Sequence, residues 1–340
     1  MRSMRRRTAG LAAMALAAAA LTACSDSEGA EEPSLVVYNA QHEELIDAVA
    51  ASFTDATGID VQLRNGSDLE LANQLVQEGD ASPADVFLTE NSPAMTLVDG
   101  QDLFAPLERR TLRAIPAQYR PDDGRWTGFA ARSTVLVYNT ASVRPDELPD
   151  SLLELAEPQW RGRISFSPAG ADFQAIVSAV LATEGEPATR EWLAGLKRNG
   201  TVYDGNNVVL QSVNAGESDA GVIYHYYWYR DQEESGENSN GSKLHFFGDH
   251  DPGAFLSVSG AGVLQGSDDA TDAQAFVRYL TGAEGQRVIA DSYALEYTLN
   301  PRVPLGRGVK PLSGLQPPRV DVSDLNSPQV VDLMTEAGFL

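Results

Sequence analysis

Residues 224–229 read Tyr-His-Tyr-Tyr-Trp-Tyr, which gathers four phenols and one imidazole with no cysteine nearby. Charge-dense metal ions prefer oxygen donors, whereas thiolates select softer metals. A deprotonated phenol concentrates its charge on one oxygen, so this segment suits a trivalent ion such as Fe(III). Aromatic runs are also often buried for their large apolar area. The segment by itself therefore indicates either metal ligation or an aromatic core element.

Two of these tyrosines, Tyr226 and Tyr227, are adjacent, so their hydroxyls can meet only at a bend of the chain. Neighbouring side chains point to opposite faces of a strand and diverge by about 100° on a helix. Residues 221–224 predict a buried strand and residues 228–233 the start of a helix, which places the pair at the turn between them. A tyrosine has an ordinary pKa of about 10, and a bound cation expels its proton. Metal binding is therefore expected to release protons and to weaken as pH falls.

The elements that would position these side chains alternate between strands and helices. Short apolar runs predict strands at residues 35–38, 59–63, 85–88, 134–138, 162–167 and 220–224. Apolar residues at helical spacing from Leu45 to Phe53 predict a helix that stops at Gly58. This alternation is typical of parallel or mixed sheets covered by helices, with functional residues at the carboxyl ends of the strands. The chain after residue 33 is long for one hydrophobic core and predicts two domains.

The first residues predict export from the cytoplasm. Four arginines among the first seven residues precede an apolar run at 11–21, which is typical of a secretion signal and too short for a membrane span. The run ends at a segment that resembles the lipobox of bacterial lipoproteins, and its cysteine, Cys24, is the only one in the chain. We expect a signal peptide at 1–23, a lipid on Cys24 and an acidic flexible tether at 24–33. The protein would then be anchored to the outer face of the cell membrane.

The chain is strongly acidic, with a formal net charge of -23. Removal of the signal peptide leaves 21 basic residues against 48 acidic ones, a net charge of -27. This charge argues against a nucleic-acid partner. The sequence also has neither a Gly-x-Ser-x-Gly elbow nor a His-Glu-x-x-His motif, so a secreted hydrolase is poorly supported.

Several spaced motifs occur in one order along the chain. They comprise residues 37–42, 82–87 with Glu90 after them, 226–228, 251–254, and 284–287 continuing through 299–301. In this order they resemble the bacterial ferric-ion-binding proteins, the substrate-binding components of iron ABC transporters. The resemblance implies an α/β, type II periplasmic-binding-protein fold, in which two α/β lobes joined by crossover strands close on a ligand. It also implies a monomeric receptor that is not an enzyme and that delivers Fe(III) to an ABC permease.

The resemblance carries over four iron ligands. His42 and Glu90 match the histidine and glutamate of the first lobe, and Tyr226 and Tyr227 match the adjacent tyrosines of the second. His42 and Glu90 each lie just beyond a predicted strand, where a crevice is expected. Taken singly, His42 could be a capping or satisfied polar histidine, and Glu90 could be an acidic residue at the start of a helix.

Four ligands leave positions for an anion or water on Fe(III), which usually takes roughly six donors. In better-known members of the family, a Ser-Gly-Ala loop and two asparagines of the second lobe hold a phosphate. Here the loop reads Gly170, Ala171, Asp172; Asn206 keeps one asparagine, and Tyr224 stands in place of the other. An aspartate would repel phosphate. One hypothesis is that Asp172 replaces the anion, by coordinating iron or holding a water, with Tyr224 as a donor behind it. The alternative is a solvated Asp172, with an anion such as carbonate on the Asn206 side.

One further cationic residue and three histidines complete the candidates. Arg132 matches a family arginine near the cleft, and it could balance the ligand carboxylates or form a hinge-side ion pair. His225, His245 and His250 are less favoured as ligands, and His225 is expected to point away from the cleft.

The predicted lobe boundaries follow the fold that the resemblance implies. We expect a first lobe at 34–115, 121–133 and 259–308, a second lobe at 134–258 and 309–340, and crossings near 115–134 and 258–261. The main alternative function is a binding protein of the same fold for an organic ligand, an anion or a ferric chelate, with the aromatic run as a stacking wall. Another trivalent or divalent metal could also use these ligands.

Overall fold

A computed structural model describes residues 35–325 and 327–340 of the chain. The predicted signal peptide, Cys24 and the tether lie outside the described residues. Within the described part, none of the helices combines the length and apolarity that a membrane span requires.

The strands form one ladder in the order β2-β1-β3-β10-β5-β8-β6-β7. Their bounds are β1 Leu35–Asn39, β2 Val61–Asn65, β3 Val86–Leu88, β5 Trp126–Asn139, β6 Ile164–Phe166, β7 Gly200–Val202, β8 Ala220–Tyr224 and β10 Leu256–Leu264. Three short strands attach at the sides: β4 Phe104–Ala105 to β10, and β9 Ser242–His245 and β11 Tyr297–Thr298 to β5. All six predicted strands are confirmed, although β5 extends further and β2 begins at Val61 because residues 59 and 60 precede the pairing.

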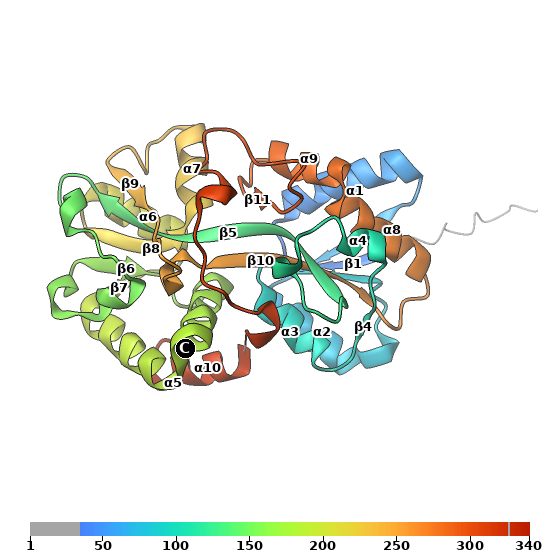
Figure 1. The fold of residues 1–340 in the computed structure, drawn as a ribbon, viewed down its shortest axis with the longest axis horizontal. Helices are drawn as coiled ribbons and strands as arrows, with labels where there is room; N and C mark the ends of the chain where they lie inside the picture. Colours follow the sequence, from blue (N-terminus) through green and yellow to red (C-terminus); the bar gives the residue numbers. More distant parts are fainter. Residues whose placement is uncertain (1–34, 326) are drawn as a thin grey trace, which may run out of the picture. The chain divides into compact units, whose positions relative to one another are not determined.

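Strand β5 changes partners along its length (Figure 1). Residues 126–133 pair antiparallel with β10, and residues 134–138 pair antiparallel with β8. Strands β1, β2 and β3 on one side, and β6 and β8 on the other, pair in parallel within their own groups. Two strands, β5 and β10, therefore connect the two halves of the ladder, as crossover strands do.

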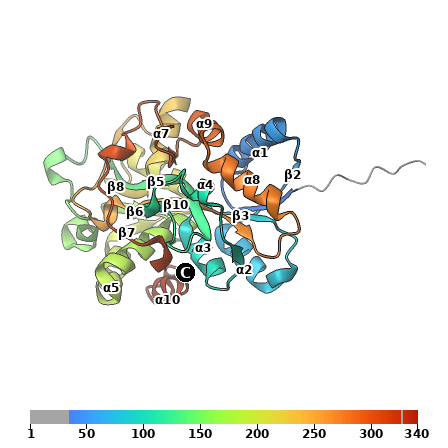
Figure 2. The same cartoon turned by 45° about the vertical axis from the view of Figure 1, so that its right-hand side comes forward.

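Helices cover both halves of the ladder. On the first half lie α1 Glu43–Thr57, α2 Asp68–Glu78, α3 Ser92–Asp99, α4 Arg109–Leu112, α8 Ala270–Thr281 and α9 Ala283–Asp291. On the second half lie α5 Ala171–Asn199, α6 Asn206–Ala215, α7 His225–Glu234 and α10 Ser327–Glu336. Figure 2 shows α1, α8 and α9 side by side. The predicted end of α1 is confirmed, because Gly58 adopts φ 78°, a left-handed conformation that glycine accepts without strain.

The hydrophobic core follows this division. One cluster packs β1, β3, α1 and α8, with Val37, Phe53 and Phe276 among its buried members. Another packs β6, β8, α5 and α10, around Phe166 and Trp192. Both halves thus have their own apolar support, and the strand ends between them are free to carry polar side chains.

Candidate metal centre

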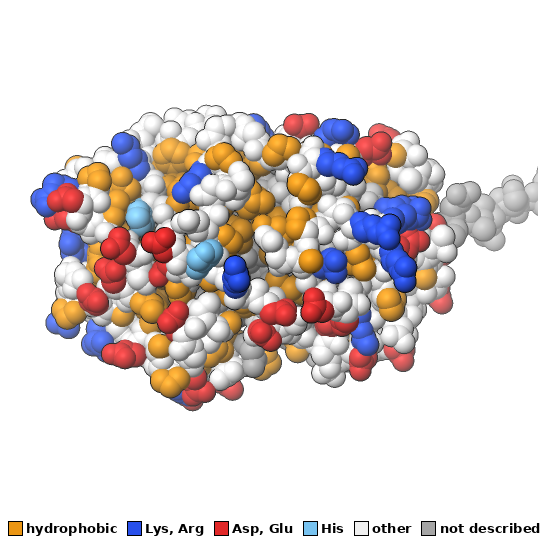
Figure 3. Space-filling view, viewed as in Figure 1, with side chains coloured by type: hydrophobic (Ala, Val, Ile, Leu, Met, Phe, Trp, Pro, Cys, Tyr) orange, Lys and Arg blue, Asp and Glu red, His pale blue; other side chains and the backbone are white. Residues whose placement is uncertain are grey.

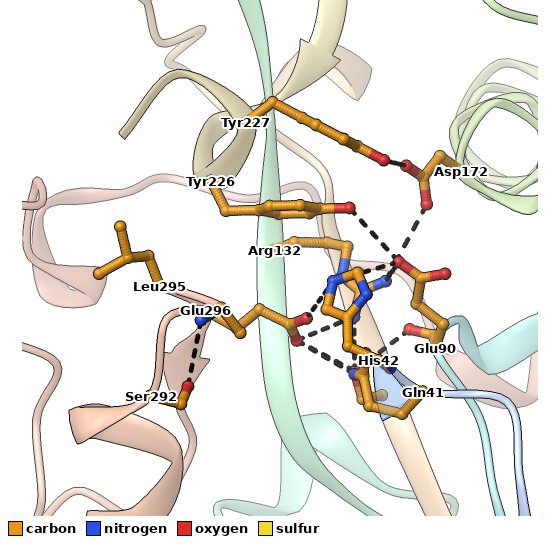
Figure 4. A network of polar contacts seen from close by, with 12 residues as sticks. Gln41, His42, Glu90, Arg132, Asp172, Tyr226, Tyr227, Ser292, Leu295 and Glu296 are labelled. Carbon is orange, nitrogen blue, oxygen red and sulfur yellow. Dashed lines mark hydrogen bonds and ion pairs between the residues drawn. The ribbon is translucent and has the colours of Figure 1, made fainter. Parts of the chain in front are cut away.

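The four predicted ligands converge between the two halves of the ladder (Figure 4). The Tyr226 hydroxyl donates to Glu90 Oε1 at 3.4 Å, and His42 Nε2 lies 3.9 Å from the same oxygen. The rings of His42 and Tyr226 meet edge to face at 5.4 Å, and Tyr227 stacks on Tyr226 with centroids 4.2 Å apart. Residues far apart in the sequence thus form one group of oxygen and nitrogen donors.

Each of these side chains lies at the beginning of a helix. His42 immediately precedes α1, and Glu90 lies two residues before α3. Tyr226 and Tyr227 occupy the first turn of α7. Helix N-termini carry partial positive charge from unpaired N–H groups, which favours anions. The helix N-termini therefore offset part of the cost of ionising the carboxylate and the phenols.

The tyrosine pair differs from its predicted placement in one respect. Helix α7 begins at His225, three residues before the predicted start, so the pair lies on a helix and not in a turn. Tyr224 is still extended, with φ −88° and ψ 151°, and the chain becomes helical directly after it. The sequence has no Ser, Thr, Asp or Asn at this position to mark the start, which is why the boundary was missed.

Asp172 joins the group from the first turn of α5 and is 7% exposed. Its Oδ2 accepts hydrogen bonds from the Tyr227 hydroxyl at 3.0 Å and from Asn206 Nδ2 at 2.9 Å. Asn91 Nδ2 lies 3.4 Å from its Oδ1. The structure therefore buries this carboxylate, in contrast to the alternative in which it is solvated.

The remaining predicted residues around the anion position behave differently. Gly170 and Ala171 form the entry to α5, and Gly170 is exposed. The Tyr224 hydroxyl donates at 3.1 Å to the main-chain carbonyl of Asp172, so it supports the loop and does not bond the carboxylate. Asn206, at the first position of α6, donates its Nδ2–H to Asp172 Oδ2.

Arg132 is fully buried on β5 and links the acids of the site. Its Nη1 lies 2.7 Å from Glu90 Oε1 and 4.0 Å from Asp172 Oδ1, and its Nη2 lies 2.8 Å from Glu296 Oε2. The guanidinium also faces the ring of Tyr226 at 5.8 Å. Arg132 thus balances a candidate ligand and forms an ion pair beside the crossover, so both predicted roles are combined in one side chain.

Glu296 also belongs to the site, although the sequence motifs do not point to it. It is fully buried, its Oε1 lies 3.3 Å from His42 Nε2, and its Oε2 accepts from Arg132 and, at 3.2 Å, from Gln41 Nε2. One signal could have found it: a single acid between Leu295 and Tyr297 interrupts an apolar run, and buried acids are rare unless paired. His225 points away as expected, because Ser133 N–H donates to its Nδ1 and its Nε2–H donates to the Leu295 carbonyl.

The backbone before α3 is held by a second buried acid. Asp68 accepts the N–H groups of Glu90 and Asn91 at 2.8 and 3.0 Å, which fixes the position from which Glu90 projects. Burial raises the pKa of Asp68 to about 7.

Burial keeps the metal-free site largely protonated. It raises the pKa of Glu90 to about 7 and that of Asp172 to about 7, and the neighbouring carboxyls reinforce the effect on Asp172. The pKa values of Tyr226 and Tyr227 are raised above the ordinary range by burial and by Asp172. Burial lowers the pKa of His42, which leaves its imidazole neutral. The site therefore holds protons that a multiply charged cation would displace.

The phenols are the further donors that a metal site at this place would use. Across residues 35–325 and 327–340, no three or more His, Cys, Asp and Glu side chains form a group that could hold a metal ion by themselves. A cation at this place would depend on the oxygens of Tyr226 and Tyr227, whose hard donor character favours a trivalent ion.

Residues 81–312 match the family model described as bacterial extracellular solute-binding protein. The chain is 52% identical over 338 residues, 99% of this chain and 100% of the relative, to the Fe(3+)-binding periplasmic protein of Serratia marcescens. It is 37% identical over 331 residues, 96% of this chain and 98% of the relative, to the major ferric iron-binding protein of Neisseria meningitidis serogroup A.

Solved structures resemble the chain over most of its length. Iron-bound HitA from Pseudomonas aeruginosa matches with a TM-score of 0.84 and 38% identity, covering 90% of this chain and 100% of that one. The Trichodesmium FutA complex with iron and citrate matches with a TM-score of 0.80 and 25% identity, covering 91% and 100%. These matches confirm the predicted two-lobed, type II periplasmic-binding-protein fold.

Proposed function

The chain belongs to the bacterial extracellular solute-binding proteins, and we propose that, like the ferric-iron-binding relatives that it matches, it binds ferric iron outside the cytoplasm and delivers it to an ABC permease. One observation carries this function: two stacked phenols, a neutral imidazole and a carboxylate converge from both halves of the ladder. The relatives are binding proteins, and we propose no catalytic role for this chain.

In the proposed site, iron is held by His42, Glu90, Tyr226 and Tyr227. Two phenolates and one carboxylate would match the three positive charges of the ion, so binding requires little further compensation from the protein. Arg132 would stay paired with Glu296 and keep that second carboxylate from overcharging the site. Iron therefore replaces the protons that the phenols and carboxyls hold in its absence.

Asp172 is proposed to take the place of a bound anion. Its carboxylate already accepts a hydrogen bond at 2.9 Å from Asn206, the one remaining asparagine of the anion site. It also accepts the hydrogen bond of the Tyr227 hydroxyl, so it would either coordinate iron or hold a water when that proton leaves. A phosphate or carbonate would have to break both contacts, and we propose that iron binding needs neither.

Closure of the two lobes would signal that iron is bound. Contacts already cross between them, from Tyr226 to Glu90 at 3.4 Å and from Asn91 to Asp172 at 3.4 Å. Iron with ligands in both lobes favours the closed state by its differential affinity. We propose lobe boundaries at the change of partner in β5, between residues 133 and 134, and at 258–261 in β10, with the C-terminal part after 308 returning to the second lobe.

Several parts of the proposal concern the membrane side. The closed, monomeric receptor would dock on the permease, and a lipid on Cys24 would keep it at the outer face of the cell membrane. Incubation of exporting cells with a radiolabelled fatty acid, with Cys24→Ala as the control, tests the anchor directly. Unlabelled wild-type protein would contradict lipidation.

A ferric chelate is the alternative cargo. It is favoured by the FutA structure from Trichodesmium, which contains iron and citrate together. In that case an organic carboxylate would complete the iron coordination, and Asp172 would have to yield its position or share it.

Visible absorption of the purified protein tests the function. We expect a phenolate-to-iron band that saturates at one equivalent when metal-free protein is titrated with a ferric chelate in phosphate-free buffer. The Tyr226→Phe, Tyr227→Phe double variant should lose the band. The control is Tyr279→Phe, whose hydroxyl bonds Ser52 on α1, away from the site. No band with or without added phosphate, carbonate or citrate would contradict ferric iron as the cargo.

A further inference from the structure

A cavity of about 690 Å³ lies between β10 and the C-terminal segment that crosses it. In Figure 1 this segment runs in front of β5 and β10 before it enters α10. Residues 117–120, Phe255, Leu256, Val258 and residues 317–322 are among those that line the cavity. Its size is within the range of small-molecule sites.

The cavity and the candidate metal centre lie on opposite faces of the crossover strands. Ser257 bonds Asn91, and Ser259 bonds Arg132, so these serines face the metal centre. Side chains alternate along a strand, which turns Leu256 and Val258 to the other face, where they line the cavity. The cavity is thus separate from the iron site and lies behind the hinge.

The wall of the cavity is largely apolar, and two arginines and two aspartates are its charged residues. Tyr119, Phe255, Leu256 and Val258 are buried side chains of this wall. Figure 3 shows hydrophobic side chains gathered in the middle of this face of the molecule. Arg120, Arg319 and His250 also line the cavity. An apolar wall with a few convergent charged groups is typical of a binding site for a small organic ligand.

The two arginines lack counterions in the part of the chain that the structure describes. Neither Arg120 nor Arg319 forms an ion pair there, and Arg120 Nε is buried without a hydrogen-bond partner. A buried donor without a partner is costly, and an anionic acceptor would remove that cost. Arg132 of the metal centre, in contrast, pairs with Glu90 and Glu296.

The two aspartates of the cavity form no ion pair with Arg120 or Arg319 in the part of the chain that the structure describes. Asp321 accepts hydrogen bonds from the Ser323 N–H and hydroxyl within its own turn. Asp122 is exposed to solvent. His250 donates its Nδ1–H to the Pro317 carbonyl, which ties the C-terminal segment to the rim.

We propose that this cavity is a second ligand site, for a small organic anion with an apolar body. The anionic group pairs with Arg120 and Arg319, and the body packs against Tyr119, Phe255 and Val258. Charge-assisted hydrogen bonds to the guanidinium groups provide the selectivity for an anion.

Occupancy of this site is coupled to the iron cleft, a consequence that rests on the proposed iron function. Residues of both predicted lobes line the cavity. On the opposite face, Tyr226 contacts Glu90 across the cleft in this structure. Closing the cleft on one face of a hinge spreads the opposite face, so an occupant of the cavity favours the closed form. Ligand and iron then strengthen each other's binding by the same factor.

Calorimetric titration of the metal-free protein with 2-naphthalenesulfonate tests the site, since sulfonates are weak ligands of ferric iron. We expect one equivalent to bind, with the neutral 2-naphthalenesulfonamide weaker by about tenfold or more. Arg120→Gln with Arg319→Gln should weaken the sulfonate by a similar factor. Arg110→Gln, an exposed arginine paired with Glu108, is the matched control. Val320→Phe, which fills the cavity from the C-terminal segment, should also abolish binding.

The outcomes separate the site from its coupling. Absence of saturable binding, equal binding of the neutral sulfonamide, or binding that survives the arginine changes would overturn the site. These measurements use no iron, so they stand whether or not the iron function holds. Saturating sulfonate should raise the iron affinity about fivefold or more. An unchanged iron affinity in sulfonate-saturated protein would overturn the coupling.

Discussion

The acidity of the buried carboxyls predicts how iron affinity depends on pH. In the metal-free protein Glu90 and Asp172 have pKa values of about 7, and the pKa values of Tyr226 and Tyr227 lie above the ordinary range. Iron needs the ionised form of each ligand, so binding expels these protons. Affinity must therefore fall as pH falls, and it falls more steeply below pH 7, where the carboxyls are also protonated.

The size of the effect follows from the number of protons. Two phenols each release one proton throughout the range, so the affinity falls about 10⁴-fold between pH 7.5 and 5.5 from the phenols alone. Each carboxyl with a pKa of about 7 contributes a further factor of about 25 over the same range. An Asp172→Asn variant lacks one of these factors. Its fall in iron affinity between pH 7.5 and 5.5 should therefore be about 25 times smaller than that of the wild type.

Competition for iron against nitrilotriacetate, read from the visible band at several pH values, measures this difference. The chelator's own protonation is the same for both proteins and cancels in the comparison. Asp332→Asn on α10, an exposed acid remote from the site, is the control and should follow the wild type. Parallel curves for the wild type and Asp172→Asn would refute the reasoning, because Asp172 would then not ionise when iron binds.

Two further predictions concern the metal-free protein. Arg132→Met leaves Glu90 and Glu296 without their shared cation, so the free energy of unfolding in urea should fall by about 3–5 kcal/mol, whereas Arg144→Met at an exposed pair should change it little; a loss below about 1 kcal/mol would contradict the role of Arg132. The raised pKa values of Asp68, Glu90 and Asp172 stabilise the folded state below about pH 7 and lose that effect as pH rises through 7. The lowered pKa of His225 offsets a small part of this, so unfolding should cost about 2 kcal/mol more at pH 6.5 than at pH 8. Equal or reversed stability at the two pH values would count against this reasoning.

Much of the fold was predictable because its strands and helices are locally encoded. The strand at 220–224 is a run of apolar residues, and Gly58 marks the end of α1 by the conformation that only glycine accepts easily. The start of α7 was not predictable, since no capping residue precedes His225 and packing of the aromatic side chains overrides their modest helix propensity.

The candidate ligands His42, Glu90, Tyr226 and Tyr227 came from ordered motifs and from the chemistry of phenols, both of which are present in the linear sequence. Glu296 was not found, because nothing local connects it to His42, more than 250 residues away, or to Arg132. A residue of this kind is defined by its partners, and those partners are brought together only when β5, β10 and β11 assemble.

The sequence by itself determined the donor types, their order and the elements that carry them, because side-chain chemistry and local periodicity are properties of short segments. The tertiary structure decided which charges meet: Arg132 between Glu90 and Glu296, and Asp172 buried against Tyr227 and Asn206. Burial in a shared low-dielectric site sets the protonation of these groups, and burial is a property of the assembled fold. The same holds for the cavity behind the hinge, whose apolar wall comes from segments that are distant in the chain. Its two arginines form no ion pair with any residue that the structure describes.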